Sequence, residues 1–191
     1  MNIFLFNENP VIYVDKNQQR GKHDNIDSYL KENNIKAIRK KLPTGDYVLD
    51  LNNSEIYIDT KKDWDELGKN LFGKKKQNFI DEIERADKEN KPLIILIEEE
   101  KELNKWKNPR SDRCFTYNWK SIKNRINELC AIYPKLYFLN CSRKSTPKLL
   151  LGFLTGQIDF DENSDKQKEQ DEFFEWLMET YPDGLPNSET L

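Results

Sequence analysis

The residues best suited to chemistry are Asp46, Asp59 and Lys61, which stand close together in the sequence. Phosphodiester hydrolysis needs carboxylates to hold a metal ion and a further positive charge to stabilise the transition state. Asp46 and Asp59 provide the carboxylates, and the backbone carbonyl of Thr60 adds an oxygen ligand. Lys61 follows Asp59 by two residues, so both point from the same face of a strand. This spacing predicts a catalytic site that uses Mg²⁺ or Mn²⁺.

An acidic residue two positions before a lysine is common in this highly charged chain. It also occurs at 89–91 and 99–101. The copy at 89–91 lies where a predicted helix ends, and the copy at 99–101 lacks a preceding Gly-Asp turn. Only the copy at 59–61 follows a Gly-Asp pair and lies on a predicted strand. We therefore take this copy as the candidate catalytic triplet.

Hydrophobic periodicity alternates between the values of strands and helices and indicates an α/β domain with a central mixed sheet flanked by helices. Strands are predicted at 3–6, 11–15, 36–42, 46–51, 55–61, 93–99 and 136–140. Helices are predicted at 24–33, 63–72, 75–89, 118–132, from Thr146 onward, and at 171–181. A turn at 52–54 would fold the strands carrying Asp46 and Asp59 against each other.

Charge divides the chain of 191 residues into a basic body and an acidic tail. Residues 158–191 contain 11 acidic residues and 2 lysines, which leaves the first 157 residues with a net charge of +6. We expect a nuclease domain at 1–157, followed by an acidic linker and a short amphipathic C-terminal helix. The basic body suggests DNA binding or simply a solvated surface. Three interpretations of the tail stay open: a solubilising linker, a docking segment for a protein partner or homodimer, or a mimic that occupies a DNA groove.

Several protein classes are excluded by composition. The three cysteines, at 114, 130 and 141, have no spacing typical of a disulfide framework or a zinc ribbon, and we expect reduced thiols. His23 is the only histidine, which excludes His-rich nuclease motifs; we interpret it as a surface or helix-cap residue. No apolar stretch approaches the roughly 20 residues needed to cross a bilayer. A cytoplasmic protein that does not bind membranes is therefore expected.

The segments LPTGDY and IYIDTKKDWDEL resemble the XPF-type nuclease domain, a family with the restriction-endonuclease-like PD-(D/E)xK fold. The signature of that family is Gly-Asp, a variable spacer, Glu-Arg-Lys, three residues and Asp. Gly45 and Asp46 match the first pair, the triplet at 59–61 occupies the Glu-Arg-Lys positions, and Asp65 follows after three intervening residues. The resemblance covers about 10–157 and suggests a minimal phage or bacterial form.

The resemblance implies two further acidic residues in the site. Asp15 matches the acid at the end of the first core strand and is expected to assist as a metal ligand. Glu82 matches a glutamate of the following helix and is expected, with Asp65, to support the site. Thr60 departs from the family by replacing its arginine, and Gln77 and Asn78 stand where relatives carry basic residues.

Basic residues outside this motif are candidates for DNA contacts. They are Lys74, Lys75, Lys76, Lys105, Lys107, Arg110, Arg113 and Lys120. The stretch 101–125 has eight basic residues against two acidic ones, interleaved with aromatic residues such as Trp106 and Phe115. Such a mixture can bind phosphates and stack on unpaired bases. The alternative is that the aromatic residues pack in the core and the charges are solvated.

Two functions remain open from the sequence. The first is a metal-dependent DNA endonuclease, acting on branched or single-strand-containing DNA as the resemblance implies, in recombination, replication or repair. The second is a non-catalytic nucleic-acid-binding or protein-interaction module that retains the fold, including roles in defence or counter-defence. Enrichment in Lys, Asn and Ile suggests a bacterial cell or a phage-infected host.

Overall fold

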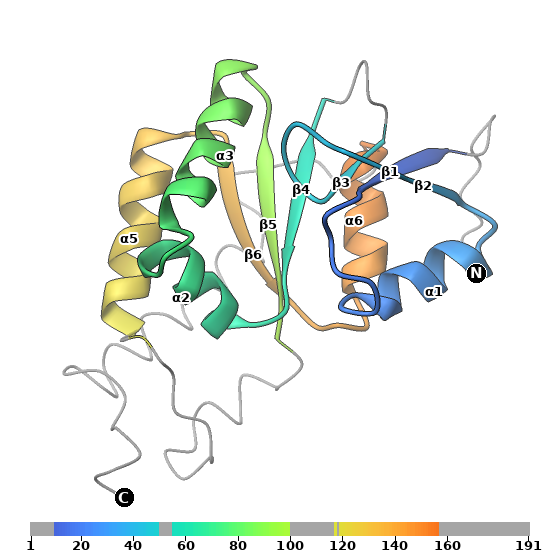
Figure 1. Ribbon diagram of the computed structural model, residues 1–191, viewed down its shortest axis with the longest axis horizontal. Helices are drawn as coiled ribbons and strands as arrows, with labels where there is room; N and C mark the ends of the chain where they lie inside the picture. The colour runs from blue at the N-terminus through green and yellow to red at the C-terminus, as the bar shows by residue number, and fades with distance from the viewer. Residues whose placement is uncertain (1–9, 50–54, 100–116, 118, 157–191) are drawn as a thin grey trace, which may run out of the picture.

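The computed structural model describes residues 10–49, 55–99, 117 and 119–156 (Figure 1). Its strands are β1 (Val11–Asp15), β2 (Lys36–Lys40), β3 (Tyr47–Val48), β4 (Tyr57–Lys61), β5 (Leu93–Glu98) and β6 (Leu136–Cys141). Its helices are α1 (Asp24–Glu32), α2 (Trp64–Phe72), α3 (Lys76–Lys88), α5 (Trp119–Ile132) and α6 (Thr146–Leu154). The predicted strand at 3–6, the turn at 52–54 and the whole segment 158–191 lie outside the described residues.

The strands form one mixed sheet in the order β2-β1-β3-β4-β5-β6. Strand β3 pairs antiparallel with both β1 and β4, whereas the pairs β1–β2, β4–β5 and β5–β6 are parallel. Strands β1, β4, β5 and β6 therefore run in the same direction, and their carboxyl ends meet at one edge of the sheet. In open α/β sheets this edge is where ligands bind.

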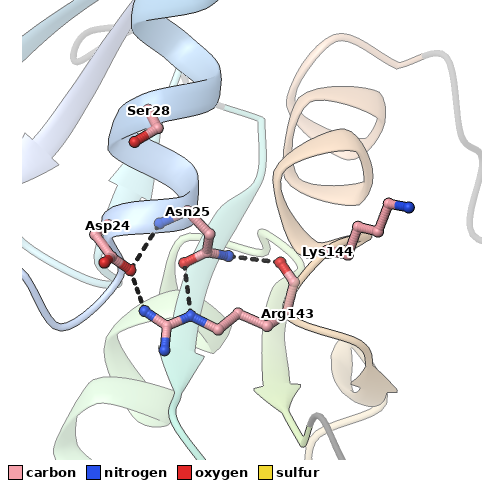
Figure 2. A pocket seen from close by; sticks show the side chains of 5 residues that line it. All are labelled: Asp24, Asn25, Ser28, Arg143 and Lys144. Carbon is pink, nitrogen blue, oxygen red and sulfur yellow. Dashed lines mark hydrogen bonds and ion pairs between the residues drawn. The ribbon is translucent and has the colours of Figure 1, made fainter.

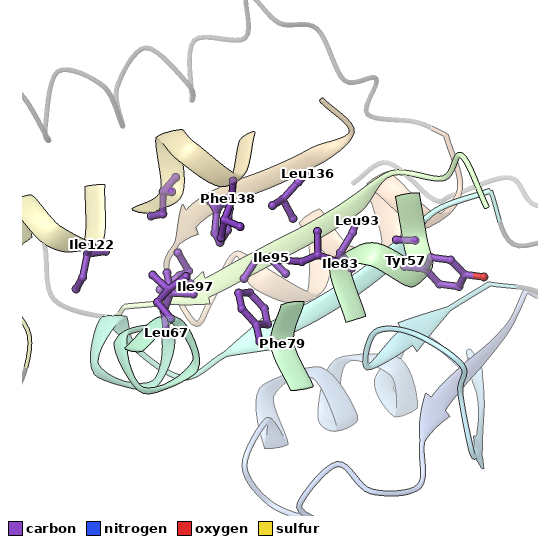
Figure 3. Close-up of a cluster of buried hydrophobic side chains, with 14 of the residues drawn as sticks. Tyr57, Leu67, Phe79, Ile83, Leu93, Ile95, Ile97, Ile122, Leu136 and Phe138 are labelled. Carbon is purple, nitrogen blue, oxygen red and sulfur yellow. The ribbon is translucent and has the colours of Figure 1, made fainter. Parts of the chain in front are cut away.

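Helices cover both faces of the sheet, which gives three layers (Figure 1). Helices α2, α3 and α5 pack on one face around Phe79, Ile95 and Phe138, part of the cluster in Figure 3. Helices α1 and α6 pack on the other face around Ile26, Ile94 and other buried side chains. The two apolar faces explain why β5 is buried along its whole length. This architecture confirms the predicted fold class.

The predicted helices and strands are present wherever the structure describes them, but β3 is shorter than expected. The prediction was 46–51, of which 50 and 51 lie outside the described residues; among 46–49, Tyr47 and Val48 form the strand. Asp46 lies just before β3: its carboxylate accepts the Thr60 amide at 3.0 Å, while its own amide and carbonyl bond to Ile58 and Asp15. The local departure from strand geometry thus occurs at a predicted site residue.

Two predictions drawn from composition can be compared with the described residues. Cys130 and Cys141 are free thiols, as expected, and Cys114 lies outside these residues. Among the described helices, none has both the length and the apolar character needed to cross a bilayer.

Candidate active site

The pairing of β3 with β4 brings Asp46 and Asp59 together. Tyr47 pairs with Ile58, and the Asp46 amide donates to the Ile58 carbonyl at 2.7 Å. Asp46 precedes this pair on one strand and Asp59 follows it on the other, so they are cross-strand neighbours. The Asp15 amide donates to the Asp46 carbonyl at 2.8 Å, which places the end of β1 beside them. Backbone pairing therefore gathers the three predicted acidic residues at the carboxyl edge of the sheet.

Gly45 forms the turn that precedes Asp46. Its φ of +70° lies in the left-handed region, and a Cβ built there would lie 2.8 Å from the Ile58 carbonyl oxygen. Both the conformation and the close approach require glycine. The Gly45 amide also donates to Glu82 at 2.7 Å. The Gly-Asp pair of the sequence motif thus has a physical basis: glycine permits the turn that delivers Asp46.

Asp59 and Lys61 form a buried ion pair. They are only 3% and 6% exposed, and the Lys61 ammonium contacts Asp59 Oδ2. The same ammonium lies 5.1 Å from the centre of the Phe79 ring, a distance suited to a cation–π interaction. Burial would lower the pKa of Lys61, but Asp59 and Asp46 outweigh it and raise that pKa above its usual value. The neighbouring carboxylates therefore favour the charged form of Lys61.

The copy of the acid-x-lysine pattern at 89–91 has a different environment. Glu89 and Lys91 also form an ion pair, at 3.1 Å, and Lys91 lies 5.3 Å from the ring centre of Tyr57. However, the Glu89 and Lys91 side chains are 41% and 29% exposed, and the pair precedes β5 at the amino-terminal edge of the sheet. This pair therefore differs from the one at 59–61 in both exposure and position; that the copy at 59–61 forms a catalytic site stays a prediction. Lys101 of the third copy lies outside the described residues.

Glu82 of α3 approaches the same acidic group, as the resemblance implied. Burial first, and then the negative charge of Asp59, raise its pKa to about 7. Burial likewise raises the pKa of Asp59 to about 7; Lys61 opposes this shift and Asp46 adds to it. Three carboxylates thus surround one ammonium group. The excess negative charge is costly without a further cation.

Asp46 is oriented by Thr60, the residue at the family's arginine position. Asp46 Oδ2 accepts one hydrogen bond from the Thr60 amide at 3.0 Å and another from the Thr60 hydroxyl at 2.7 Å. Thr60 is 1% exposed, so this contact is shielded from water. The use of the Thr60 carbonyl as a metal ligand stays a prediction.

His23 is the main correction to the sequence interpretation. It does occupy the N-cap position of α1, but without a side-chain cap hydrogen bond, and it is not on the surface: the residue is 3% exposed. Its Nε2 lies 3.2 Å from the Thr60 hydroxyl and its Nδ1 lies 2.6 Å from Glu98 Oε2. The sequence did not reveal this burial, although the β1–α1 connection placed the start of α1 near the carboxyl end of β1.

Asp15 and Asp65 are placed differently: Asp15 lines the same cleft as Asp46 and Asp59, whereas Asp65 does not line it. The two carboxylate oxygens of Asp15 accept backbone amides of Leu42 at 3.1 Å and Asn17 at 3.2 Å. This arrangement orders the loops beside the site. Asp65 lies in the first turn of α2, yet from that turn Glu66, not Asp65, lines the cleft. The roles predicted for Asp15 and Asp65 stay predictions.

A cleft of about 650 Å³ opens over these residues. Asp46, Asp59 and Lys61 line it, together with a rim that includes Lys62, Lys69 and Lys75.

The predicted basic residues fall into three groups. Lys75 lines the cleft, and Lys74 and Lys76 are exposed next to it. Lys120 is exposed on α5. The other four, Lys105, Lys107, Arg110 and Arg113, lie outside the described residues.

The donor set fits Mg²⁺ or Mn²⁺. Among the described residues, no three Asp, Glu, His or Cys side chains converge tightly enough to hold an ion alone. Mg²⁺ commonly needs only one or two carboxylates because it retains several waters. Asp46 and Asp59 can provide these two, and a divalent ion would neutralise the excess negative charge described above.

Thr44 offers a simple test of the packing around the site. Its hydroxyl is buried and has no hydrogen-bond partner among the described residues. We expect Thr44→Val to preserve shape and raise the free energy of unfolding by about 1 kcal/mol, because an unsatisfied polar group is removed. Urea denaturation would measure this change. A loss of stability instead would indicate that the hydroxyl has a partner outside the described residues.

Comparison with known proteins identifies the family and the fold. The protein has a restriction-endonuclease-like fold, with acidic residues at the carboxyl edge of its sheet. Residues 14–151 match the ERCC4 domain model, and the chain belongs to the ERCC4 domain family. Among curated proteins, none matches the chain by sequence.

Two solved structures share the fold. XPF from Aeropyrum pernix has a TM-score of 0.56 at 19% identity, covering 90% of this chain and 72% of that one. The same XPF in complex with DNA has a TM-score of 0.55 at 20% identity, covering 91% of this chain and 82% of that one.

Proposed function

We propose that this protein is a divalent-metal-dependent DNA endonuclease. The observation that carries the proposal is the buried Asp59–Lys61 pair, adjacent to Asp46 and open to a cleft with a lysine rim. Membership of the ERCC4 domain family supports a nuclease domain, and the similar XPF structure was solved with DNA. The site chemistry and the family assignment therefore point to the same activity.

Each residue has a distinct role in this proposal. When bound, a Mg²⁺ or Mn²⁺ ion supplies Lewis acidity and lowers the pKa of a water molecule. Asp46 and Asp59 would hold that ion. The Lys61 ammonium donates hydrogen bonds to the phosphoryl oxygens and so stabilises the negative charge that develops on them. Because Lys61 is buried, solvent does not weaken this interaction.

The lysine rim accounts for substrate binding. Lys62, Lys69 and Lys75 line the cleft and would contact phosphates, which position a DNA strand without reading its sequence. We infer that the substrate is branched or contains single-stranded DNA, and that the protein serves recombination, replication or repair in a bacterial cell or a phage-infected host. The family resemblance supports this inference.

The proposal can be tested with labelled fork, flap, junction, linear duplex and single-stranded substrates. We expect cleavage of a branched substrate in Mn²⁺ or Mg²⁺, no cleavage in EDTA, and no cleavage by Asp59→Asn. The substitution preserves the side-chain shape, and thermal unfolding would verify that the variant folds. Cleavage that persists in EDTA or in the folded Asp59→Asn protein would contradict the proposed site.

A second candidate is a DNA-binding module without catalytic activity. The presence of Thr60 at the family's arginine position favours it, because that change removes a positive charge from the site. In the same assay this candidate predicts a mobility shift for branched DNA without cleavage in either metal ion. Metal-dependent cutting would exclude it.

A further inference from the structure

His23 belongs to a buried hydrogen-bond chain that ends on Asp46. The chain runs from Asp46 Oδ2 to the Thr60 hydroxyl at 2.7 Å, and from that hydroxyl to His23 Nε2 at 3.2 Å. It continues from His23 Nδ1 to Glu98 Oε2 at 2.6 Å. Three elements are linked in this way: β4, the start of α1 and the end of β5. The candidate metal site is thus connected to groups on the opposite face of the sheet.

The directions of these hydrogen bonds follow from the number of protons available. The Thr60 hydroxyl has one proton, which goes to Asp46, and it also accepts from Gln18 Nε2 at 3.1 Å. The arrangement therefore uses both ring nitrogens of His23 as donors, Nε2 to the hydroxyl oxygen and Nδ1 to the Glu98 carboxylate. Two donors facing this oxygen prevent the hydroxyl from turning away from Asp46. The orientation of the Asp46 carboxylate consequently depends on the position of the His23 ring.

The far end of the chain is anchored firmly. Glu98 is buried, and its Oε1 accepts from Asn25 Nδ2 at 2.7 Å. Asn25 Nδ2 also donates to the Arg143 carbonyl at 2.7 Å, and the Arg143 guanidinium contacts Asp24, as Figure 2 shows. These contacts tie α1 to the loop between β6 and α6. Glu98 is therefore fixed in place and can hold the His23 ring in one orientation.

We propose that His23 is a positioning residue that acts through Thr60 to fix the Asp46 carboxylate for metal binding. The inference rests on the proposed metal-dependent function and extends it to residues outside the sequence motif. Groups that orient a metal ligand through hydrogen bonds typically change metal affinity about 10- to 100-fold when they are substituted. Thr60 makes the direct contact, and His23 and Glu98 determine which way its hydroxyl points.

The test measures Mg²⁺ and Mn²⁺ binding to the full chain by calorimetry, without DNA. We expect Thr60→Val and His23→Gln to weaken binding about 10-fold or more, and Thr60→Ser to preserve it because the hydroxyl is kept. Thr44→Val is the matched control: it removes a buried hydroxyl two residues from Asp46 that has no described partner. This control should bind metal as the parent protein does.

A spectroscopic readout separates positioning from general stability. Since His23 is the only histidine, histidine-selective nitrogen labelling gives NMR signals from one residue. We expect Mg²⁺ to shift the Nε2 signal in the parent protein and in Thr44→Val. The shift should disappear in Thr60→Val, which breaks the link to Asp46.

The outcomes distinguish this inference from the proposed function. If Asp46→Asn leaves metal affinity unchanged, the proposed metal site is wrong. If Asp46→Asn abolishes binding but folded Thr60→Val and His23→Gln bind normally, only the positioning role is wrong. If His23→Gln does not fold, metal binding by Thr60→Val and the NMR experiment on the parent protein still test the positioning role. An Nε2 signal that does not shift in saturating Mg²⁺ would overturn the inference.

Discussion

Replacing Lys61 by methionine is expected to lower the rate of DNA cleavage by about 10²- to 10³-fold, the usual cost of losing one group that stabilises transition-state charge. Methionine keeps the buried aliphatic chain against Phe79 but removes the ammonium group. Binding of Mn²⁺ should not weaken, because the substitution removes a positive charge beside Asp59. Single-turnover cleavage in saturating Mn²⁺, with calorimetry of Mn²⁺ binding, would measure both effects.

Lys91→Met provides the control for this prediction. Lys91 also pairs with an acidic residue two positions earlier and also lies over an aromatic ring, but on the protein surface at the opposite edge of the sheet. The same chemical change there should leave the cleavage rate unaltered. If Lys61→Met retained more than about a tenth of the parent rate, or if both variants lost activity equally, the role assigned to Lys61 would be wrong.

The core of the site could be predicted because its spacing has direct geometric consequences. Asp59 and Lys61 are two residues apart on a strand and must share a face. Gly45 before Asp46 predicted a turn, and its positive φ and contact with Ile58 explain why. The continuous apolar run at 93–99 likewise predicted a strand buried on both faces, which β5 is. In each case local sequence and local structure are linked by short-range geometry.

Residues brought in by tertiary contacts could not be predicted in the same way. His23 stands 37 positions before Thr60 and 75 before Glu98, so nothing in its neighbourhood indicates either contact. Its position before a helix suggested a cap, which is correct for the backbone but not for the side chain. Glu66, which lines the cleft and pairs with Lys22, was likewise missed in favour of its neighbour Asp65. Which of two adjacent acidic residues faces the cleft depends on how the helix is rotated about its axis relative to the sheet, and the sequence does not give that rotation.

Glu82→Gln is expected to stabilise the metal-free protein at about pH 8 by on the order of 2 kcal/mol. Glutamine retains an acceptor for the Gly45 amide but cannot ionise. Burial and Asp59 raise the pKa of Glu82 from 4.5 to about 7, so the folded protein favours the protonated form. Ionisation of Glu82 therefore costs stability progressively as pH rises from about 4.5 to about 7, and above that range the full cost is present.

Chemical denaturation in EDTA across this pH range would measure the difference. At about pH 4 the two proteins should be equally stable, because Glu82 is then protonated in both the folded and the unfolded state. Glu84→Gln removes the same charge from the same helix and serves as the control for loss of a carboxylate outside the acidic group around Lys61. A constant difference between Glu82→Gln and the parent protein at all pH values would contradict the prediction.

Adding Mg²⁺ should narrow the gap between the parent protein and Glu82→Gln at about pH 8. A divalent cation binds more favourably where carboxylates are ionised and crowded, so the parent protein gains more stability from the ion than the variant does. The acidic cluster around Lys61 would thus destabilise the metal-free fold and strengthen metal binding through the same charges. If Mg²⁺ stabilised both proteins equally, Glu82 would not belong to the electrostatic environment of the bound ion.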